Sequence, residues 1–439
     1  NKVPLQDYES LKPYIDRTIK GERDVLWPGK TKWFAKSSGT TSDRSKYIPI
    51  TKEALQNCHY QSGQDVLTLY LENFPERGIF SGKGMVMGGS QSIHSLNEEA
   101  ITGDLSAILM QNMPIIGEIY RVPKLEVALM DDWEEKLSML IESTLSEDLT
   151  NISGVPSWTL VFFQRVLEQS GMTDIAEVWP NLELFVHGGV SFAPYREAYK
   201  KVNPSGSMSL QEVYNASEGF IAIQDKPGRA DMLLLLDNGI YYEFLPVNAD
   251  SDQEVVSLSG VETGVVYSLI ISTNGGLWRY QLGDTIEFTD LNPYRIKIAG
   301  RTKHFINVFG EELMVTNTDK ALAEVCAKHQ CTVRDYTVGP IFMESEKGGG
   351  HEWMIEFVAP PDDIESFAED LDKELQTLNS DYAAKRSYDL AIGFPVIRIL
   401  EAGTFDKWLK SKGKLGGQHK VPRLSNERKY LEELSKWLS

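Results

Sequence analysis

Cysteine is scarce in this chain of 439 residues, which holds only Cys58, Cys326 and Cys331. An odd and sparse set makes a poor disulfide framework, so the composition favours a reducing, cytoplasmic compartment. Long hydrophobic runs are also absent, since the longest apolar stretches, such as residues 232–236, fall far short of the roughly 20 residues that span a bilayer. Residues 1–16 are polar and carry no apolar signal-peptide core. We therefore expect a cytoplasmic protein that does not enter membranes.

Positive charge is in deficit as well. Lys and Arg total 44 against 63 Asp and Glu, which gives a net charge of −19 and an isoelectric point near 4.9. Nucleic acids and anionic membrane surfaces are bound by clustered Lys and Arg, so we expect neither as a partner. A small phosphorylated ligand needs only local positive charge and stays open. With 41% hydrophobic and 24% charged residues, the chain has the composition of a globular protein that buries a sizeable core.

The first 300 residues change pattern once. Residues 1–200 mix helical and strand signals, and Thr51 has the position of an N-cap before a helix with apolar residues at Leu55, Cys58 and Val66. Residues 231–300 contain short apolar segments separated by Asn-Gly and Gly-Gly turns, which predicts a β-meander or a small β-barrel. The expected strands cover residues 232–236, 240–245, 265–271, 277–281, 285–288 and 295–298.

The pattern changes again after residue 300. It predicts a helix over 319–328, strands over 332–342, 353–359 and 395–400, and a terminal helix. Apolar residues at 364, 367, 371, 375 and 378 form the stripe of an amphipathic helix. The chain is thus expected to be α/β, with a large N-terminal domain over 1–300 and a smaller, mobile C-terminal α/β domain over 301–439, hinged at 300–303. The alternative is one continuous domain.

A hydroxyl-rich loop is the most informative motif. It consists of Ser37, Ser38, Gly39, Thr40, Thr41 and Ser42, with Lys46 following. Closely spaced backbone N–H groups and hydroxyls can hold phosphate oxygens, Gly39 permits conformations that a side chain forbids, and Lys46 adds a full positive charge. It is not a Walker A loop, because G-x-x-x-x-G-K-[ST] is absent. The alternative is an ordinary surface loop between two strands.

A carboxylate lies between two predicted strands at residues 214–219. Glu218 stands beside Ser217 and before Gly219, after the probable strand over 210–213. One carboxylate at a strand end can hold Mg²⁺ while phosphate oxygens fill other positions of the metal. The alternative is a capped turn with a solvated Glu218.

Two further motifs fit a nucleotide. Asp284 follows Gly283, and a carboxylate in such a place can accept both hydroxyls of a ribose; the alternative is a plain hairpin turn. The pair Gly188 and Gly189 leaves room for a flat ring to approach the backbone, whereas the preceding His187 is more typical of a hydrogen-bonded core residue.

Lys420 belongs to a basic, glycine-rich stretch over residues 413–423, which is unusual in so acidic a protein. A mobile loop that carries a lysine to a phosphate is one interpretation, and a flexible solvated loop is the other. Cys326, His329 and Cys331 also lie close together, but three ligands without a fourth predict zinc only weakly.

The order of these motifs is more specific than any one of them. The succession S-S-G-T-T-S, G-G, Y-x-x-S-E-G, R-Y-x-x-G-D, G-R-T-K and a late lysine resembles adenylate-forming enzymes. More closely, residues 3–8, 187–192 and 420–423 are similar to the GH3 (auxin-responsive promoter) acyl acid–amido synthetases, in particular their bacterial homologues. The resemblance extends over essentially the whole chain. Family members carry a helical segment before the stretch at residues 3–8, so we expect a truncated or partly ordered chain.

The resemblance implies a role for each matching residue. It implies a large N-terminal adenylate-forming domain and a hinged C-terminal domain. Ser37 to Ser42 match the phosphate-binding loop, with Lys46 or Arg44 supplying charge and Asp43 pointing outward. The other implied contacts are Gly188 and Gly189 beside adenine and the acyl group, Tyr214 near adenine, Glu218 with Mg²⁺, Asp284 with the ribose, Arg301 at the hinge, and Lys420 entering the site.

The implied activity is ATP- and Mg²⁺-dependent ligation of a carboxylic acid to an amine, expected to be that of an amino acid. An acyl-CoA ligase with the same acyl-adenylate intermediate is the alternative, although no basic patch for CoA is evident outside the nucleotide motifs. A non-catalytic nucleotide-binding protein is a third hypothesis, which the presence of Glu218, Asp284 and Lys420 disfavours. A monomer is the default expectation.

Overall fold

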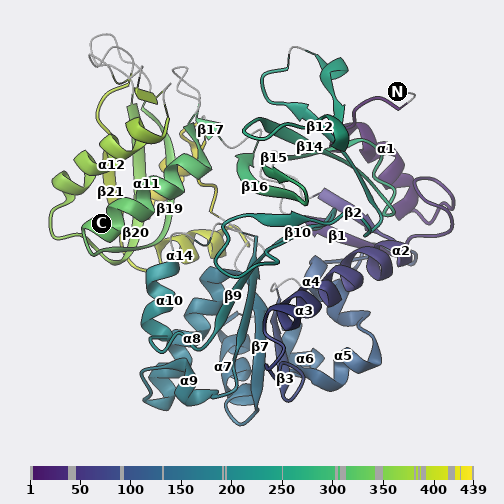
Figure 1. Ribbon diagram of the computed structural model, residues 1–439, viewed down its shortest axis with the longest axis horizontal. Helices are drawn as coiled ribbons and strands as arrows, with labels where there is room; N and C mark the ends of the chain where they lie inside the picture. Colours follow the sequence, from purple (N-terminus) through teal and green to yellow (C-terminus); the bar gives the residue numbers. More distant parts are fainter. Residues whose placement is uncertain are drawn as a thin grey trace. The chain divides into compact units, whose positions relative to one another are not determined.

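The computed structural model forms two compact units (Figure 1). Described residues of 3–189 and 200–297 belong to the first unit, and those of 192–199 and 298–437 to the second. Among the helices described, none combines the length and apolar character required to cross a bilayer. The structure describes residues 3–37, 46–88, 93–130, 133–189, 192, 195–249, 251–301, 305–306, 313–341, 350–379, 382–383, 386, 392–413, 421–425 and 427–437.

The elements from residue 3 to residue 301 follow the chain as two sets. The helices are α1 Tyr8–Ile19, α2 Lys52–Ala54, the π-helical turn η1 Leu55–Tyr60, α3 Gln61–Asn73, α4 Leu105–Gln111, α5 Ile115–Tyr120, α6 Leu125–Ala128, α7 Trp133–Thr144, α8 Pro156–Ser170, α9 Ile175–Val178 and α10 Arg196–Val202. The strands are β1 Trp33–Ser37, β2 Lys46–Ile50, β3 Lys83–Met87, β4 His94–Ser95, β5 Ile101–Gly103, β6 Arg121–Val122, β7 Leu149–Gly154, β8 Leu184–Gly188, β9 Ser209–Ala216, β10 Gly219–Ile223, β11 Met232–Leu234, β12 Ile240–Pro246, β13 Val256–Ser257, β14 Val266–Thr273, β15 Tyr280–Leu291 and β16 Tyr294–Arg301.

A parallel sheet in the order β6-β3-β7-β8-β9 forms the base of the first unit. Side chains alternate along β8, so its two faces pack against different helices. Leu184 and Val186 meet Tyr70 of α3, whereas Phe185 meets Phe163 of α8. Figure 1 accordingly shows α3 on one side of these strands and α8 with α9 on the other. Both faces are covered, as in α/β proteins with parallel sheets.

The strands after residue 216 continue this sheet in antiparallel fashion. From β9 the order runs β10-β11-β16-β15-β14-β12-β13. The predicted meander is therefore present, but it does not close into a separate barrel, because β11 pairs with β10 through Leu234 and Ala222. The meander therefore joins the rest of the sheet through the pairing of β11 with β10, which local sequence signals do not specify.

One predicted pair of strands is wrong. The expected strands at 277–281 and 285–288 form a single strand, β15, which starts at Tyr280. Its register against β14 shifts between Ser268 and Ile270, because Ser268 pairs with Thr285 and Ile270 with Gln281. The extra residues form a β-bulge, in which Gly283 has a φ of +88° that a residue with a side chain adopts at a cost.

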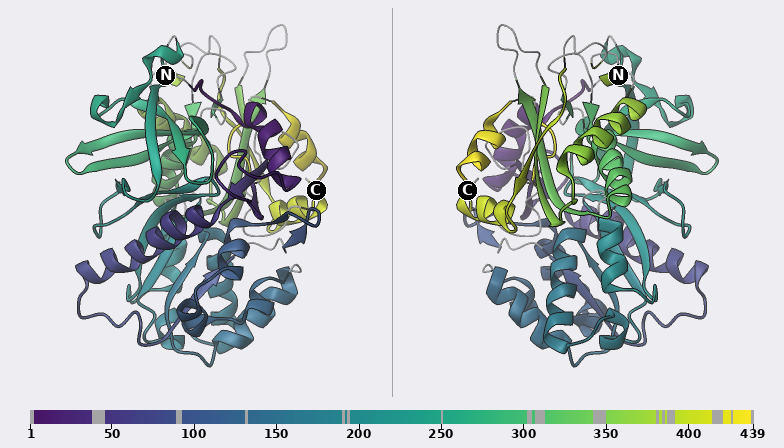
Figure 2. Two further views of the ribbon diagram at one scale, coloured as in Figure 1. Left: turned by 90° about the vertical axis from the view of Figure 1, so that its right-hand side faces the viewer. Right: turned by 90° about the vertical axis from the view of Figure 1, so that its left-hand side faces the viewer.

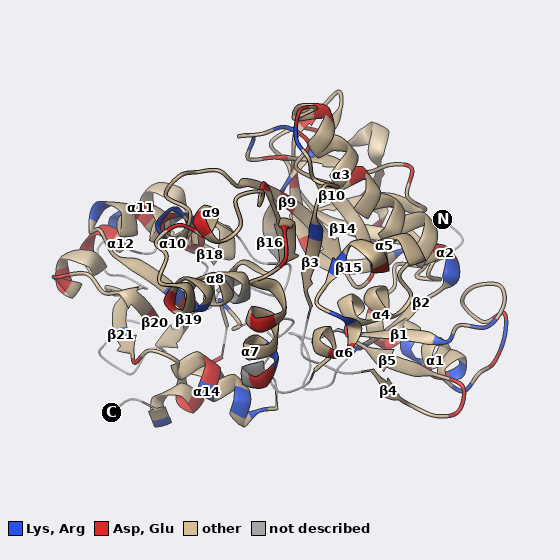
Figure 3. Ribbon diagram, turned by 90° about the horizontal axis from the view of Figure 1, so that it is seen from below, with Lys and Arg blue, Asp and Glu red and all other residues tan. Residues whose placement is uncertain are grey.

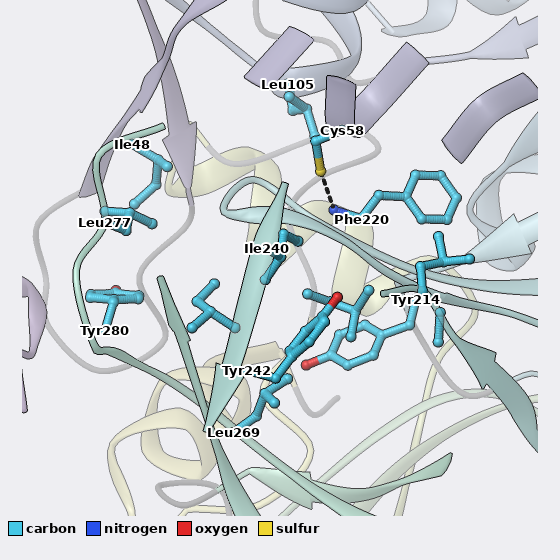
Figure 4. Close-up of a cluster of buried hydrophobic side chains, with 14 of the residues drawn as sticks. Ile48, Cys58, Leu105, Tyr214, Phe220, Ile240, Tyr242, Leu269, Leu277 and Tyr280 are labelled. Carbon is cyan, nitrogen blue, oxygen red and sulfur yellow. Dashed lines mark hydrogen bonds between the residues drawn. The ribbon is translucent and has the colours of Figure 1, made fainter. Parts of the chain in front are cut away.

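A second, smaller sheet in the order β2-β1-β5-β4 lies in the same unit. Helix α1 begins in a capping box, where Asp7 accepts from Ser10 N at 2.9 Å and the Ser10 hydroxyl accepts from Asp7 N. Its buried residues Leu11 and Ile15 join a hydrophobic core that extends into strands β10 to β15. Figure 4 shows part of this core around Tyr242 and Leu269.

The second unit is a three-stranded sheet with helices on both faces. Its elements are β17 Phe305–Ile306, β18 Leu313–Met314, α11 Val315–Lys328, β19 Thr332–Ile341, β20 Gly350–Ala359, α12 Ile364–Leu378, β21 Val396–Leu400, α14 Thr404–Ser411 and α15 Lys429–Leu434. Alternation along β20 again separates two cores: Trp353 and Ile355 pack with α11 and α12, and Met354 packs with α14 and α15. Figure 2 shows these two pairs of helices on opposite sides of the strands. The predicted α/β class, with a smaller C-terminal α/β part, is confirmed.

Candidate active site

The carboxyl end of strand β8 carries the first candidate residues. Strands β8 and β9 run parallel, and Gly188 pairs with Val213, the residue before Tyr214. A Cβ atom at Gly188 would collide with the carbonyl oxygen of Val213, so only glycine fits this close approach. Gly189 follows with a φ of +83°. Ligands of open α/β sheets bind outside the carboxyl ends of parallel strands, which is where these glycines lie.

Tyr214 and Asp284 form the best-defined contact of the candidate site. The hydroxyl of Tyr214 donates to Oδ2 of Asp284 at 2.5 Å, and each residue is 6% exposed. Tyr214 lies on β9 and Asp284 in the bulge of β15, two strands that are not neighbours in the sheet. The bulge directs the Asp284 carboxylate toward β9, a use of bulges that is common beside functional sites. The hydrogen bond leaves the carboxylate with further lone pairs for a ligand hydroxyl.

Glu218 lies in the two-residue turn between β9 and β10. The antiparallel pair of Ala216 with Gly219 closes this turn. Phe220, which follows Gly219, is held from outside the hairpin, since its N–H donates to Sγ of Cys58 at 3.3 Å (Figure 4). Its carbonyl accepts from the Asn238 amide. Cys58 belongs to the π-helical turn η1, a local irregularity that often occurs at functional sites. The start of β10, two residues after Glu218, is thus held by contacts from two other segments.

Tyr280 connects Glu218 and Asp284. Burial raises the pKa of the Tyr280 hydroxyl, and the carboxylates of Glu218 and Asp284 add to this rise, as does the acidic Asp7. These charges act on Tyr280 only because they are near it. Two predicted site residues, one in the β9–β10 turn and one in β15, therefore lie near the same buried tyrosine. Tyr280, which is 1% exposed, is part of the R-Y-x-x-G-D motif, but the sequence alone assigned it no role.

Lys46 is connected to Tyr280 by way of Tyr8, which lies near both. The Lys46 ammonium lies 5.7 Å from the centre of the Tyr8 ring, and the Tyr8 hydroxyl accepts from Tyr47 N at 2.8 Å. Tyr8 is also among the groups that raise the pKa of Tyr280. Ser37 and Lys46, which are paired across β1 and β2, mark the two ends of the hydroxyl-rich loop. The loop therefore starts and ends close to the Tyr8 side of the candidate site.

Several predicted residues lie outside the described part of the chain. They are Ser38, Gly39, Thr40, Thr41, Ser42, Asp43, Arg44 and Lys420. For Ser37 in β1 and Arg301 at the end of β16, the structure describes the backbone alone. Ser217 occupies the turn beside Glu218. The structure thus brings Lys46, Gly188, Tyr214, Glu218 and Asp284 into one region of the first unit.

The donor set fits Mg²⁺ only together with a phosphorylated ligand. In the part of the chain that the structure describes, no three His, Cys, Asp or Glu side chains group as a metal cage. Mg²⁺ in nucleotide sites requires one or two carboxylates, because phosphate oxygens and waters complete its shell. Glu218 meets that requirement. Figure 3 shows Lys and Arg interspersed with Asp and Glu over the described elements of this view, consistent with local rather than extended positive charge.

Two features beside the site escaped sequence reasoning for different reasons. Gly283 interrupts an otherwise strand-like run, and a glycine in such a position is a known signal for a bulge. That signal would have placed Asp284 in a bulge of one long strand. The pairing of Gln6 with Tyr280, which brings Tyr8 to the site, joins segments far apart in the chain and has no local signal.

His187 is buried and its ring lies 5.4 Å from that of Phe185, as expected for a core histidine.

Comparison with known proteins gives matches over nearly the whole chain. The GH3 family N-terminal domain matches residues 1–208, the GH3 family central domain 233–301 and the GH3 family C-terminal domain 316–429. Indole-3-acetic acid-amido synthetase GH3.4 of Arabidopsis thaliana is 26% identical over 96% of this chain and 83% of its own length. The 4-substituted benzoates-glutamate ligase GH3.12 of the same plant is 24% identical over 98% and 88%. The solved GH3.15 acyl acid amido synthetase shares the fold, with a TM-score of 0.79, 19% identity, and coverage of 100% of this chain and 87% of that one.

Proposed function

Because the chain belongs to the GH3 family of acyl acid–amido synthetases, we propose that it adenylates a carboxylic acid with ATP and transfers the acyl group to the amine of an amino acid. The observation that supports this most directly is the convergence of Tyr214 and Glu218, from the β9–β10 hairpin, with Asp284 from the bulge of β15. The amino acid as acceptor is supported by relatives whose names give indole-3-acetic acid-amido synthetase and benzoate–glutamate ligase activities.

The nucleotide contacts follow from the chemistry of the described side chains. Asp284 accepts hydrogen bonds from the ribose hydroxyls, with its carboxylate oriented by Tyr214, whose ring lies beside adenine. Gly188 and Gly189 let the base and the acyl group approach the backbone. Residues 37–42 hold phosphate oxygens, and Lys46 supplies a positive charge at the end of that loop. Ser217 is assigned to the same site as a neighbour of Glu218, and Arg301 to the hinge.

Adenylation brings two anions together, so charge must be neutralised first. The substrate carboxylate attacks the α-phosphorus of ATP and pyrophosphate leaves. Mg²⁺, which we assign to Glu218, supplies charge neutralisation on the phosphates when it is bound. Lys420 is assigned the second positive charge at the reacting phosphate, where a preorganised cation stabilises the transition state. In the second step the amine attacks the acyl carbonyl and AMP leaves with its electron pair.

The arrangement along the chain is part of the proposal. We assign ATP and the acyl acid to residues 1–300 and a mobile, water-excluding role to residues 301–439, because an acyl-adenylate hydrolyses unless water is kept away. A cytoplasmic monomer from the bacterial branch of the family fits the three cysteines and the similarity at residues 3–8, 187–192 and 420–423.

ATP–pyrophosphate exchange with a panel of carboxylic acids tests the first half-reaction. We expect exchange that depends on one class of acid, and exchange with none of a broad panel would contradict adenylation. Mass spectrometry of products then offers the acyl-adenylate the common amino acids or CoA. An amide product supports the proposal, whereas a thioester in place of an amide identifies the alternative, an acyl-CoA ligase with the same intermediate.

A further inference from the structure

Two cysteines meet in the second unit, where helix α11 ends and strand β19 begins. Cys326 lies in the last turns of α11, and Cys331 immediately precedes β19. The Cys331 N–H donates to the Cys326 carbonyl at 3.1 Å, and the chain reverses through Gln330 at a φ of +50°. The Cys326 thiol also donates a hydrogen bond to the sulfur of Cys331. The two sulfur atoms are therefore direct neighbours.

His329 does not complete a metal site with this pair. Its Nε2 lies 2.7 Å from Oδ2 of Asp370 on helix α12, and Lys328 approaches the same oxygen at 2.8 Å. Asp370 thus engages the imidazole away from the thiols. No cluster of three metal-binding side chains occurs among the described residues, so the structure adds no support to the zinc site that this motif predicted only weakly. What the structure leaves is a dithiol.

Both thiols line one surface cavity. Its wall consists of Glu197 of α10, Leu322, Ala323, Cys326, Cys331, Thr332 and Val333. Cys326 is partly exposed and Cys331 is buried, and both are free thiols. A small solute that enters the cavity can therefore reach the pair, whereas a bulky reagent meets the cavity wall first.

The hydrogen bond makes the two thiols chemically unequal. The donated S–H lowers the pKa of Cys331 and raises the pKa of Cys326, because it stabilises a thiolate on Cys331 alone. The thiolate is the form that attacks an oxidant. The neighbouring thiol of Cys326 is placed to react with what forms on Cys331.

We propose that Cys326 and Cys331 are a modification site, a dithiol that a small hydroperoxide converts to a reversible disulfide. The Cys331 thiolate attacks the peroxide O–O bond; with one proton this yields a sulfenic acid and releases water, or an alcohol from an organic peroxide. The Cys326 sulfur then attacks the sulfenic sulfur, the S–O bond breaks, and water leaves with the thiol proton. Two thiols lose two electrons in total, and the peroxide gains them. The site is separate from the proposed ligase function and does not rest on it.

Cys58 is an internal control. It is buried in the first unit, its sulfur accepts from Phe220 N at 3.3 Å, and burial raises the pKa of its thiol to about 11. A buried thiol of high pKa presents little thiolate to an oxidant. One intact protein thus contains both the proposed site and an unreactive reference.

Peptide mapping after peroxide treatment of the intact protein tests the proposal. Trypsin places Cys326 on the peptide 321–328 and Cys331 on 329–334, so a disulfide joins two separate peptides. After brief exposure to hydrogen peroxide and alkylation, we expect this joined pair, with two hydrogens fewer than the sum, and its loss on treatment with dithiothreitol. Cys58 should be recovered alkylated, with a rate of oxidation at least tenfold lower.

Two variants identify the order of events. Cys326→Ser should accumulate a sulfenic acid on Cys331 that dimedone traps, whereas Cys331→Ser should leave Cys326 alkylated. The proposal is overturned if Cys326 and Cys331 are recovered on separate peptides, or if Cys58 is oxidised at the same rate. Because the readout is the covalent state of the peptides, it is independent of whether the protein proves to be a ligase.

Discussion

Tyr214 donates its hydroxyl hydrogen to Asp284 at 2.5 Å, and by this bond a side chain of β9 orients a carboxylate in the bulge of β15. Both residues are buried, so the bond is made where its electrostatic strength is little weakened by water. Without the Tyr214 hydroxyl, the Asp284 carboxylate would lose the hydrogen bond that fixes its orientation. Removing the Tyr214 hydroxyl alone therefore perturbs the proposed ribose contact while the ring beside adenine is kept.

Tyr214→Phe removes the donor and keeps the ring. We expect the KM for ATP in pyrophosphate exchange to rise about tenfold, because a hydrogen bond to a charged group contributes about 1.5–3 kcal/mol. Tyr70→Phe is the matched control, since the buried Tyr70 hydroxyl donates to the Glu183 carbonyl at 3.3 Å on the α3 face of the sheet. It should change stability but not the KM for ATP. A KM within twofold of the wild type for Tyr214→Phe would remove Asp284 from the ribose site.

Gly188 is predicted to be intolerant of even one methyl group. In Gly188→Ala the new Cβ collides with the Val213 carbonyl, so strands β8 and β9 must separate at the candidate site. We expect the free energy of unfolding in urea to fall by about 1–3 kcal/mol, the usual cost of overpacking. Gly63→Ala is the control, because Gly63 lies inside α3 with open space around it. It should gain about 0.5–1 kcal/mol. Equal stabilities of the two variants would contradict the close approach.

Lys420 is predicted to act in adenylation rather than in nucleotide binding. Lys420→Ala removes a positive charge at the reacting phosphate, and we expect pyrophosphate exchange to fall by 10²-fold or more, the scale on which lost electrostatic stabilisation appears. ATP binding, measured by calorimetry, should persist. Lys410→Ala removes an exposed lysine of α14 and should leave exchange unchanged. Exchange at the wild-type rate in Lys420→Ala would disprove this assignment.

The sequence located the local parts of the candidate site and missed the long-range ones. The turn and strand signals around Glu218 are short-range, and the structure places it between two strands as the pattern predicts. The continuation of the meander through β11 into β10 was missed, because the alternation of one strand does not name its partner. The approach of Tyr8 to Tyr280 depends on pairing between the two ends of the first unit.

The π-helical turn illustrates a third limit. Thr51 caps the helix as predicted, accepting from Ala54 N at 3.0 Å. The apolar stripe that follows gave no warning that residues 55–60 are wound more widely, which directs Cys58 at Phe220. Over so short a stretch, the apolar spacing expected of an α-helix differs little from that expected of a π-helix. The sequence pattern therefore does not distinguish the two kinds of helix.

His59, in the same π-helical turn, makes the stability of the protein depend on acid. It is 4% exposed, and burial lowers its pKa to about 4. The unfolded chain binds this proton near the usual pKa of about 6.5, so between these values the unfolded state holds more protons and stability falls as pH falls. The contribution of His59 to the free energy of unfolding is complete above about pH 6.5 and is lost by about pH 4. The free energy of unfolding falls by about 3 kcal/mol between these two pH values.

His59→Gln keeps a polar side chain that takes up no proton, so it should flatten this dependence. Urea unfolding at pH 7 and at pH 4.5 measures it: the wild type should lose about 2 kcal/mol more than His59→Gln over this interval, since the 2-unit span from pH 6.5 to pH 4.5 is worth 1.36 kcal/mol per unit at most. His94→Gln replaces an exposed histidine on β4 and should follow the wild type. If His59→Gln and the wild type fall in parallel, then His59 is protonated as easily in the folded protein as in the unfolded chain, and its burial does not control the acid response.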